Sequence, residues 1–361
     1  MKVYVYAICK NEEAFVEKWM ASMGEADGVV VADTGSTDGT VENLRSLGAQ
    51  AYSIIIDPWR FDTARNVSLD LVPADADICV CTDLDEILEP GWREKLERVW
   101  TPGVTHVRYM YTWGFNADGS RGQTFWYEKI HARKGYRWVH PVHEVLQYTG
   151  DEPERWANAA DIQLDHYPDP AKSRGQYLPL LELSHKENPQ DITTTFWLGR
   201  EYMFYGQYDK GIKILKAHLK MEGGWDVERS ASMRYIARCY QMKGDVTATK
   251  SWLMRAIAEA PSVRDPYVEM ARLGYKLADW PLTYYMVEAA LRITEKPVSY
   301  LNETSSWDFS PYDLGAIACY HIGLYARSRE LAQQACEMQQ DDERLKMNLL
   351  LIEEKLKGAG S

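Results

Sequence analysis

The stretch GVVVADTGSTDGT, residues 28–40, decides the fold class of this chain. It begins with a continuous apolar run of the kind found in strands that are buried on both faces. Gly35 and Gly39 then permit a tight turn, and Ser36 or Thr37 can cap a following helix. A buried strand that turns directly into a helix is the repeating unit of a parallel sheet covered by helices.

The same strand-to-helix alternation continues on both sides of this stretch. A β-rich segment covers residues 3–8, and apolar residues follow at helical spacing over 13–22. Further buried strands are expected at 51–57 and 77–83, so the pattern predicts an α/β domain whose ligands bind beyond the carboxyl ends of its strands. Aromatic and β-branched segments then predict short antiparallel strands at residues 105–113, 123–132, 136–138 and 142–148.

Polar residues gather where three of these strands end. The segment AICKNEE (7–13) follows the first strand, Asp33 ends the second, and Asp83 and Asp85 follow the fourth. Two carboxylates two positions apart at a strand end can aim at one ligand, and oxygen ligands suit Mg²⁺ or Mn²⁺, which commonly bridge phosphates. The alternative for Asp83 and Asp85 is a pair of solvated loop acids.

Together these segments resemble the family 2 glycosyltransferases of the GT-A fold. That family has KNE or NEE after strand one, DxGSTDGT after strand two and DxD after strand four, and the likeness covers about the first 170 residues. The segment WRFDTARN (59–66) is similar to one in the subgroup that carries tetratricopeptide repeats, although Phe61 stands one position early. This subgroup includes bacteriocin S-glycosyltransferases of the sublancin type.

The resemblance implies a nucleotide-sugar site with a bound metal ion. Asp33 would contact the base or ribose, Asp83 the ribose or the metal, and Asp85 would hold Mn²⁺ or Mg²⁺ on the diphosphate of a UDP-sugar. Arg65 would either contact a phosphate or serve as a structural fork. The residues implied to bind the nucleotide are Ala7, Glu12, Asp33, Arg65 and Asp83.

A second group of candidates lies later in the chain. If residues 142–145 are extended, His143 faces one side and Glu144 the other. The subgroup has VHE at this place, so Glu144 or His143 is a candidate to act on the acceptor nucleophile. His166, at the end of a late strand, fits an additional metal ligand by position, and the alternative is a hydrogen-bonded structural histidine.

The chain changes character near residue 180, where helical segments with recurring small residues begin. Gly199, Ala237, Ala271 and Ala316 align at spacings of 38, 34 and 45 residues, which resembles the tetratricopeptide repeat. An ordinary helical bundle is the alternative, and the step of 45 implies an insertion. We therefore expect a GT-A domain, Rossmann-like, at residues 1–180 and an all-α repeat superhelix at 181–361.

The composition of the chain excludes some classes of binding partner. The net charge of −12 and an isoelectric point of about 5.3 argue against nucleic acid. No apolar run reaches about 18 residues, so no membrane span is expected. The N-terminus does not read as a signal peptide, so a cytoplasmic, thiol-reducing location is expected, with Cys79 and Cys81 as buried strand residues.

The expected activity is a metal-dependent, inverting transfer of a hexose from a UDP-hexose to a protein or peptide acceptor, which the repeats would present. One alternative is a glycosyltransferase of cell-surface polysaccharide whose repeats form a homodimer. Others are a nucleotidyltransferase, or a non-catalytic repeat scaffold with a degenerate transferase domain. Intact Asp33, Asp83 and Asp85 argue against the scaffold, and DTGSTDGT favours glycosyl transfer.

Overall fold

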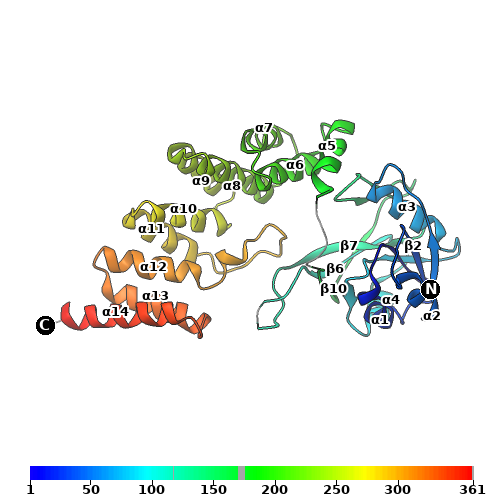
Figure 1. The fold of residues 1–361 in the computed structure, drawn as a ribbon, viewed down its shortest axis with the longest axis horizontal. Helices are drawn as coiled ribbons and strands as arrows, with labels where there is room; N and C mark the ends of the chain where they lie inside the picture. Colours follow the sequence, from blue (N-terminus) through cyan, green and yellow to red (C-terminus); the bar gives the residue numbers. More distant parts are fainter. Residues whose placement is uncertain (117, 170–174, 360–361) are drawn as a thin grey trace. The chain divides into compact units, whose positions relative to one another are not determined.

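The computed structural model describes residues 1–116, 118–169 and 175–359 (Figure 1). The chain divides into two compact units, Met1–Pro189 with Val298–Tyr300, and Gln190–Pro297 with Leu301–Ser361. The first unit is an α/β domain and the second is all-α, so the expected fold class is confirmed. The division follows Pro189, whereas we expected the helical domain to begin at residue 181.

An eight-stranded mixed sheet forms the centre of the first unit. Its strands are β1 (Val3–Cys9), β2 (Gly28–Asp33), β3 (Gln50–Ser53), β4 (Ile78–Cys81), β5 (Glu86–Leu88), β6 (His106–Thr112), β7 (Thr124–Ala132) and β10 (Trp156–His166). Their order is β3-β2-β1-β4-β7-β6-β10-β5, and a separate hairpin consists of β8 (Tyr136–Val139) and β9 (Val145–Tyr148). Strands β1 to β4 run parallel, as predicted.

The later strands differ in part from the prediction of antiparallel neighbours. β7 is antiparallel to β4 and β6, but β6 runs parallel to β10 because the β8–β9 hairpin intervenes along the chain. The short strand β5 was not expected, and it pairs antiparallel with β10 at the sheet edge. β3 ends at Ser53 rather than near residue 57.

Helices cover both faces of this sheet. They are α1 (Glu13–Ser22), α2 (Thr40–Ser46), α3 (Phe61–Leu71) and α4 (Trp92–Val99); a further helix, α5 (Tyr177–Glu187), follows the last strand along the chain. Trp19 of α1 and Trp92 of α4 pack with Val5 and Tyr109 in one core, whereas Leu69 of α3 packs on the opposite face in a second core. Cys79 and Cys81 lie in that second core as free, buried thiols, as predicted from their spacing.

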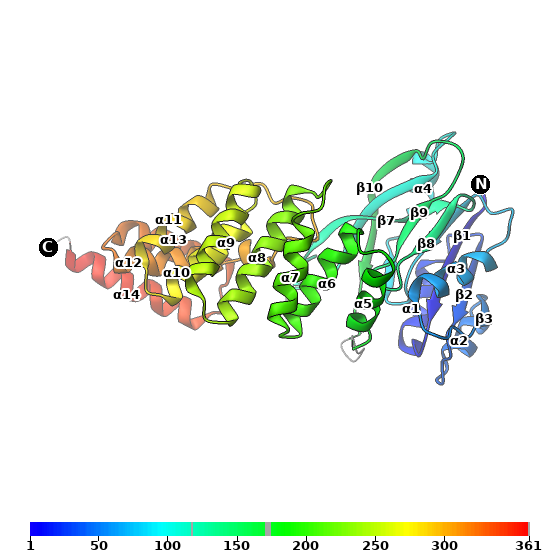
Figure 2. The ribbon, with the colours of Figure 1, turned by 90° about the horizontal axis from the view of Figure 1, so that it is seen from above.

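The second unit is a stack of helical hairpins, which follow one another in Figure 2. Its helices are α6 (Ile192–Phe204), α7 (Tyr208–His218), α8 (Asp226–Met242), α9 (Val246–Glu259), α10 (Asp265–Lys276), α11 (Trp280–Leu291), α12 (Ser310–His321), α13 (Tyr325–Met338) and α14 (Glu343–Ala359). The first helices of successive hairpins, α6, α8, α10 and α12, also contact one another. A Cβ at Gly199 would lie 2.6 Å from Leu215 Cγ, so the small residue permits close packing of α6 and α7.

The predicted insertion lies between α11 and α12 and runs along the first helices of two hairpins. Arg234 of α8 donates to the carbonyl oxygen of Leu301 (3.1 Å), and Arg272 of α10 donates to that of Ser305 (2.8 Å). Arg238 of α8 also forms an ion pair with Glu303 at 2.8 Å. The first helices of the hairpins, α6, α8, α10 and α12, form a row that we call the inner row of helices. The inserted segment of the chain therefore covers this row at α8 and α10. Within the described ranges, no helix combines the length and apolarity that a bilayer crossing requires.

Candidate active site

The segments that follow β1 and β2 are hydrogen-bonded to each other. The backbone N–H of Asn11 donates to Ser36 Oγ (2.8 Å), and that of Thr37 donates to Asn11 Oδ1 (2.7 Å). The N–H of Glu12 donates to Thr40 Oγ1 at 2.8 Å. Much of the two motifs therefore serves to fix the two turns to each other at the carboxyl edge of the sheet.

Asp33 lies at the centre of these turns and is buried. Its carboxylate accepts the N–H groups of Gly35 (3.2 Å) and Ser36 (3.1 Å), and the thiol of Cys9 (3.6 Å). Burial raises the pKa of the Cys9 thiol, which keeps it a neutral donor. We expected this carboxylate to be left for a base or ribose; instead it already holds the turn, since Oδ1 accepts from Ser36 and Cys9 and Oδ2 accepts from Gly35, which leaves at most one of about four acceptor positions.

Ala7 and Glu12 differ in their surroundings. Ala7 is fully buried within the core formed on the α1 face of the sheet, and its carbonyl oxygen accepts from Ser68 Oγ at 2.7 Å. The side chain of Ala7 is covered because strands of a doubly covered sheet are buried on both faces, and the expectation that Ala7 lines the nucleotide pocket stays a prediction. Glu12 is buried beside Thr40, at the strand end itself.

Asp83 is held by two buried cations. Arg65 Nη2 donates to both of its carboxylate oxygens (2.9 and 3.1 Å), and Lys129 Nζ lies 3.3 Å from Oδ2. Burial alone would raise the pKa of Asp83, but the charges of Arg65 and Lys129 outweigh it and hold that pKa well below its usual value. Asp83 is therefore ionised and fixed in position.

Arg65 joins three separate segments of the domain. Besides Asp83 it donates through Nε to Glu144 of the β8–β9 loop, and its Nη1 lies 3.3 Å from Cys81 Sγ. The neighbouring Asn66 exchanges two hydrogen bonds with the peptide groups of Trp138, at 2.8 and 2.9 Å. Arg65 was expected either to contact a phosphate or to serve as a structural fork. Its contacts with Asp83 and Glu144 in this structure are those of a structural fork.

Asp85 and His166 lie side by side because β5 pairs with β10. His166 stands opposite Glu86 in that pairing, and His166 Nε2 lies 3.5 Å from Asp85 Oδ2. The ring's other nitrogen, Nδ1, donates to the carbonyl oxygen of Trp113 at 2.9 Å. Burial lowers the pKa of His166, but the hydrogen bond and charge of Asp85 outweigh it and raise that pKa.

The β8–β9 loop corrects one expectation. Residues 141–144 are not extended, and His143 has a φ of 52°, so strand alternation does not decide which way His143 and Glu144 point. The His143 ring packs 5.7 Å from that of Tyr177 of α5. The three late candidates are therefore separate: His166 is beside Asp85, Glu144 reaches Asp83 through Arg65, and His143 faces α5.

Sequence reasoning missed Lys129 and gave no role of its own to Glu86. Lys129 occupies the interior of β7, where its Nζ lies between Asp83 and Glu86, 3.6 Å from Glu86 Oε1. Glu86 is buried, and burial raises the pKa of its carboxyl. A lysine inside the aromatic segment TFWYEKIHA was the available signal, because a buried lysine requires an acidic partner.

Asp85 and His166 together could supply two ligands to a metal ion that takes its other ligands from a bound nucleotide and water. Within residues 1–116, 118–169 and 175–359, no three His, Cys, Asp or Glu side chains are arranged to hold a metal. Asp85 and His166 form a pair, and His166 has the Nδ1–H to carbonyl hydrogen bond that metal-binding histidines usually have. Mg²⁺ commonly uses one or two carboxylates and takes its other ligands from phosphates and water, so Asp85 fits either ion, whereas the imidazole of His166 suits Mn²⁺ better than Mg²⁺.

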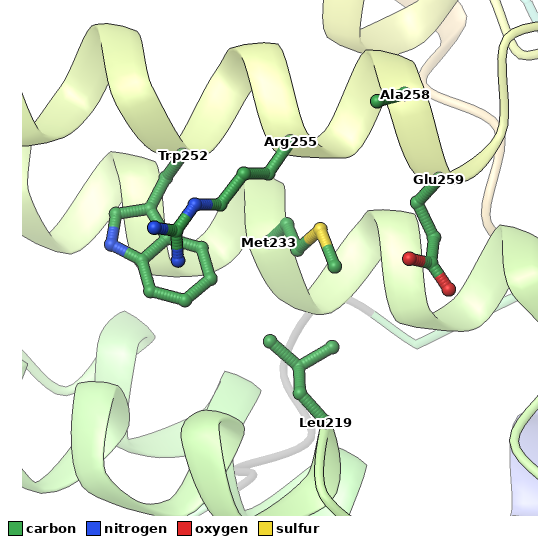
Figure 3. Close-up of a pocket in the computed structure, with 6 residues that line it drawn as sticks. All are labelled: Leu219, Met233, Trp252, Arg255, Ala258 and Glu259. Atoms are coloured by element: carbon green, nitrogen blue, oxygen red, sulfur yellow. The ribbon is translucent and has the colours of Figure 1, made fainter.

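A separate hollow of about 390 Å³ lies in the second unit (Figure 3). The guanidinium of Arg255 covers the Trp252 ring at 4.6 Å, and Met233 and Leu219 form its apolar side. It is wide open, and none of the candidate site residues lines it.

Comparison with known proteins relates the first unit to one family. Residues 4–145 match the family described as glycosyl transferase family 2. The lipopolysaccharide core biosynthesis glycosyltransferase LpsC of Rhizobium meliloti is 33% identical over 125 residues, which are 32% of this chain and 46% of that protein. The chain thus spans less than half the length of this curated relative, and nothing in these matches identifies the sublancin-type subgroup.

Solved structures match parts of this chain with low TM-scores. A crystal structure of MamA is similar to 48% of this chain and 96% of that one, with 17% identity and a TM-score of 0.38. Glucosyl-3-phosphoglycerate synthase from Mycobacterium tuberculosis, solved with Mn²⁺, UDP and glucosyl-3-phosphoglycerate, is similar over 31% of this chain and 45% of that one. Its identity is 26% and its TM-score 0.27.

Proposed function

We propose that this chain is a glycosyltransferase that moves a hexose from a UDP-hexose to an acceptor, with Mn²⁺ or Mg²⁺ held by Asp85 and His166. The observation that carries the proposal is this pair of side chains, 3.5 Å apart, in a unit whose residues 4–145 match glycosyl transferase family 2. A carboxylate beside an imidazole whose far nitrogen already donates to a carbonyl is a ready set of two metal ligands.

The protein's own residues fix the geometry of the reaction. When bound, the metal would offset the charge that develops on the leaving diphosphate. Arg65 and Lys129 hold Asp83 ionised, two positions before Asp85, and we propose that it accepts from a ribose hydroxyl. Asp33 and its turn are the proposed contacts for the base or ribose, through the acceptor capacity that the turn leaves.

Direct displacement with inversion needs one base to take the acceptor's proton. His143 and Glu144 are the proposed groups, and the structure makes their tasks different. Glu144 would have to exchange its contact with Arg65 for the acceptor, whereas His143 lies on the loop between β8 and β9. Comparing the variants His143→Ala and Glu144→Gln for transfer, with donor hydrolysis as the reference, separates the two.

Two acceptor classes remain, a protein or peptide and a saccharide. An extended peptide on the inner row of helices would meet the inserted segment at α8 and α10, where Arg234 and Arg272 already bind carbonyl oxygens of the chain itself. The relative with 33% identity is named for lipopolysaccharide core biosynthesis, which is a saccharide assembly. Both observations favour a saccharide acceptor over the peptide acceptor expected from the sequence.

Donor hydrolysis tests the proposal without an acceptor. The full chain is incubated with Mn²⁺ and UDP-glucose, UDP-galactose, UDP-N-acetylglucosamine or GDP-mannose, and release of the nucleoside diphosphate is measured. We expect slow release from a UDP-sugar, abolished by EDTA and restored by Mn²⁺ or Mg²⁺. Release from GDP-mannose alone would contradict the donor, and no release together with no UDP binding would support a non-catalytic scaffold.

A further inference from the structure

Trp113 is a large exposed aromatic side chain directly beside the proposed metal pair. It follows β6, and 44% of its surface is exposed. Its ring lies 4.9 Å from that of His166, and Tyr111 packs at 6.1 Å from the same imidazole. Covering exposed indole surface is favourable, so the exposed part of this side chain, next to the proposed metal pair, offers apolar surface for a ligand to cover.

The backbone of Trp113 is fixed at both of its hydrogen-bonding groups. Its N–H donates to the carbonyl oxygen of Gln123 (2.9 Å), and its own carbonyl oxygen accepts from His166 Nδ1 (2.9 Å). The indole is thus placed by the same residue that orients a proposed metal ligand. A pre-organised platform of this kind loses little conformational freedom when a ligand binds.

The sheet order separates Trp113 from the nucleotide side of the site. Asp33 ends β2, Asp83 and Asp85 follow β4, and β6 lies two strands beyond β4. In the proposed reaction the acceptor must approach the sugar from the side opposite the leaving diphosphate. The surface next to His166 on the β6 side, away from β2, is therefore where an acceptor would be met.

We propose that Trp113 is the stacking platform of an acceptor subsite for a saccharide, and this inference rests on the proposed function. A pyranose ring has one face of C–H groups with partial positive charge, and an aromatic face carries the complementary negative charge. Trp113 stacks on that apolar face, and the hydroxyl groups at the rim of the sugar point toward Asp85 and His166.

The chain offers a matched control. Trp126 of β7 is exposed to a similar extent, 37%. Trp126 pairs with Met110 across the strands, so these two side chains share one face of the sheet. Trp113 comes two residues after Tyr111 and shares the other face with it, so the two tryptophans lie on opposite faces. Replacing the Trp113 side chain leaves its backbone carbonyl and hence the hydrogen bond to His166 in place.

Saturation-transfer NMR tests the proposal on the full chain with UDP and Mg²⁺, which avoids line broadening by Mn²⁺. The probes are methyl glucoside and methyl galactoside at tens of millimolar, with a serine-containing and a cysteine-containing tripeptide for comparison. We expect transfer to a glycoside in the wild type, a fall of at least about fivefold in Trp113→Ala, partial recovery in Trp113→Phe, and no change in Trp126→Ala.

Calorimetric titration of UDP distinguishes this inference from the proposed function. If the wild type does not bind UDP, the proposed function fails and takes the subsite with it. If UDP binds equally in wild type and Trp113→Ala, the function stands. The subsite is then overturned by equal glycoside signals in the two proteins, by transfer to the tripeptides alone, or by no glycoside signal in the wild type.

Discussion

Arg65→Met is the sharpest test of how the site is held together. The side chain of Arg65 is 5% exposed and forms ion pairs with Asp83 and Glu144. Removing one partner of a buried ion pair typically costs about 3–5 kcal/mol, because the remaining charge is buried without compensation. Asp83 keeps Lys129 and is one-third exposed, so the lower end, about 3 kcal/mol, is expected.

Hydrogen exchange provides the assay, because a chain of two units need not unfold in a single transition. Peptides that cover β4 and β5 in the full chain report the local opening free energy. We expect their slowest amides to exchange about 100-fold faster in Arg65→Met. Arg65→Lys, which keeps the charge but not the fork, should give an intermediate result.

Arg137→Met is the matched control for Arg65→Met. Arg137 is 54% exposed and pairs with Asp70 at 3.4 Å, so its loss should cost less than about 1 kcal/mol. If the Arg65→Met effect were no larger than that of Arg137→Met, the fork would not be what joins residues 83–86 to the β8–β9 loop.

The remaining predictions concern a buried histidine, the helical unit and the β8–β9 hairpin. Burial lowers the pKa of His131 to about 3, so the unfolded chain binds one more proton than the folded chain below about pH 6.5. The free energy of unfolding should therefore fall by about 2 kcal/mol between pH 8 and pH 5. Denaturant titrations of His131→Gln should lack this contribution. Gly199→Ala should destabilise the helical unit by about 1–3 kcal/mol in thermal unfolding, since its Cβ would meet Leu215, and an unchanged melting temperature would contradict the tight contact. Asn66→Ala should expose the β8–β9 hairpin to limited proteolysis, whereas Asn66→Asp, which keeps one acceptor, should expose it less.

The parts of the fold that follow from local patterns were predictable from the sequence. The buried run before Asp33 and the helical spacing over residues 13–22 gave a strand and a helix with the observed bounds. The 3-residue strand β5 carried no comparable pattern, and its pairing with β10 depends on contacts about 80 residues apart. That pairing is what brings His166 to Asp85, so only the position of His166 at a strand end could suggest their proximity.

Charge partners were the least predictable part of the site. Asp83 and Asp85 stand two positions apart, and the spacing alone did not reveal their partners: Asp83 is held by Arg65 and Lys129, whereas Asp85 faces His166. The difference arises from α3, β7 and β10, which supply the partners from three distant places. A sequence motif can identify such residues, but only the tertiary contacts show which partner each of them has.

Binding of Mn²⁺ measured by electron paramagnetic resonance tests the central claim most directly, because the signal of free Mn²⁺ decreases when the ion binds. With UDP present, the wild type should remove Mn²⁺ from solution, and Asp85→Asn and His166→Ala should each weaken this binding at least about tenfold. Glu89→Gln, which removes an acid near β5 that pairs with Arg121 instead, should bind like the wild type. Undiminished Mn²⁺ binding in both Asp85→Asn and His166→Ala would contradict the assignment of this pair as the metal site.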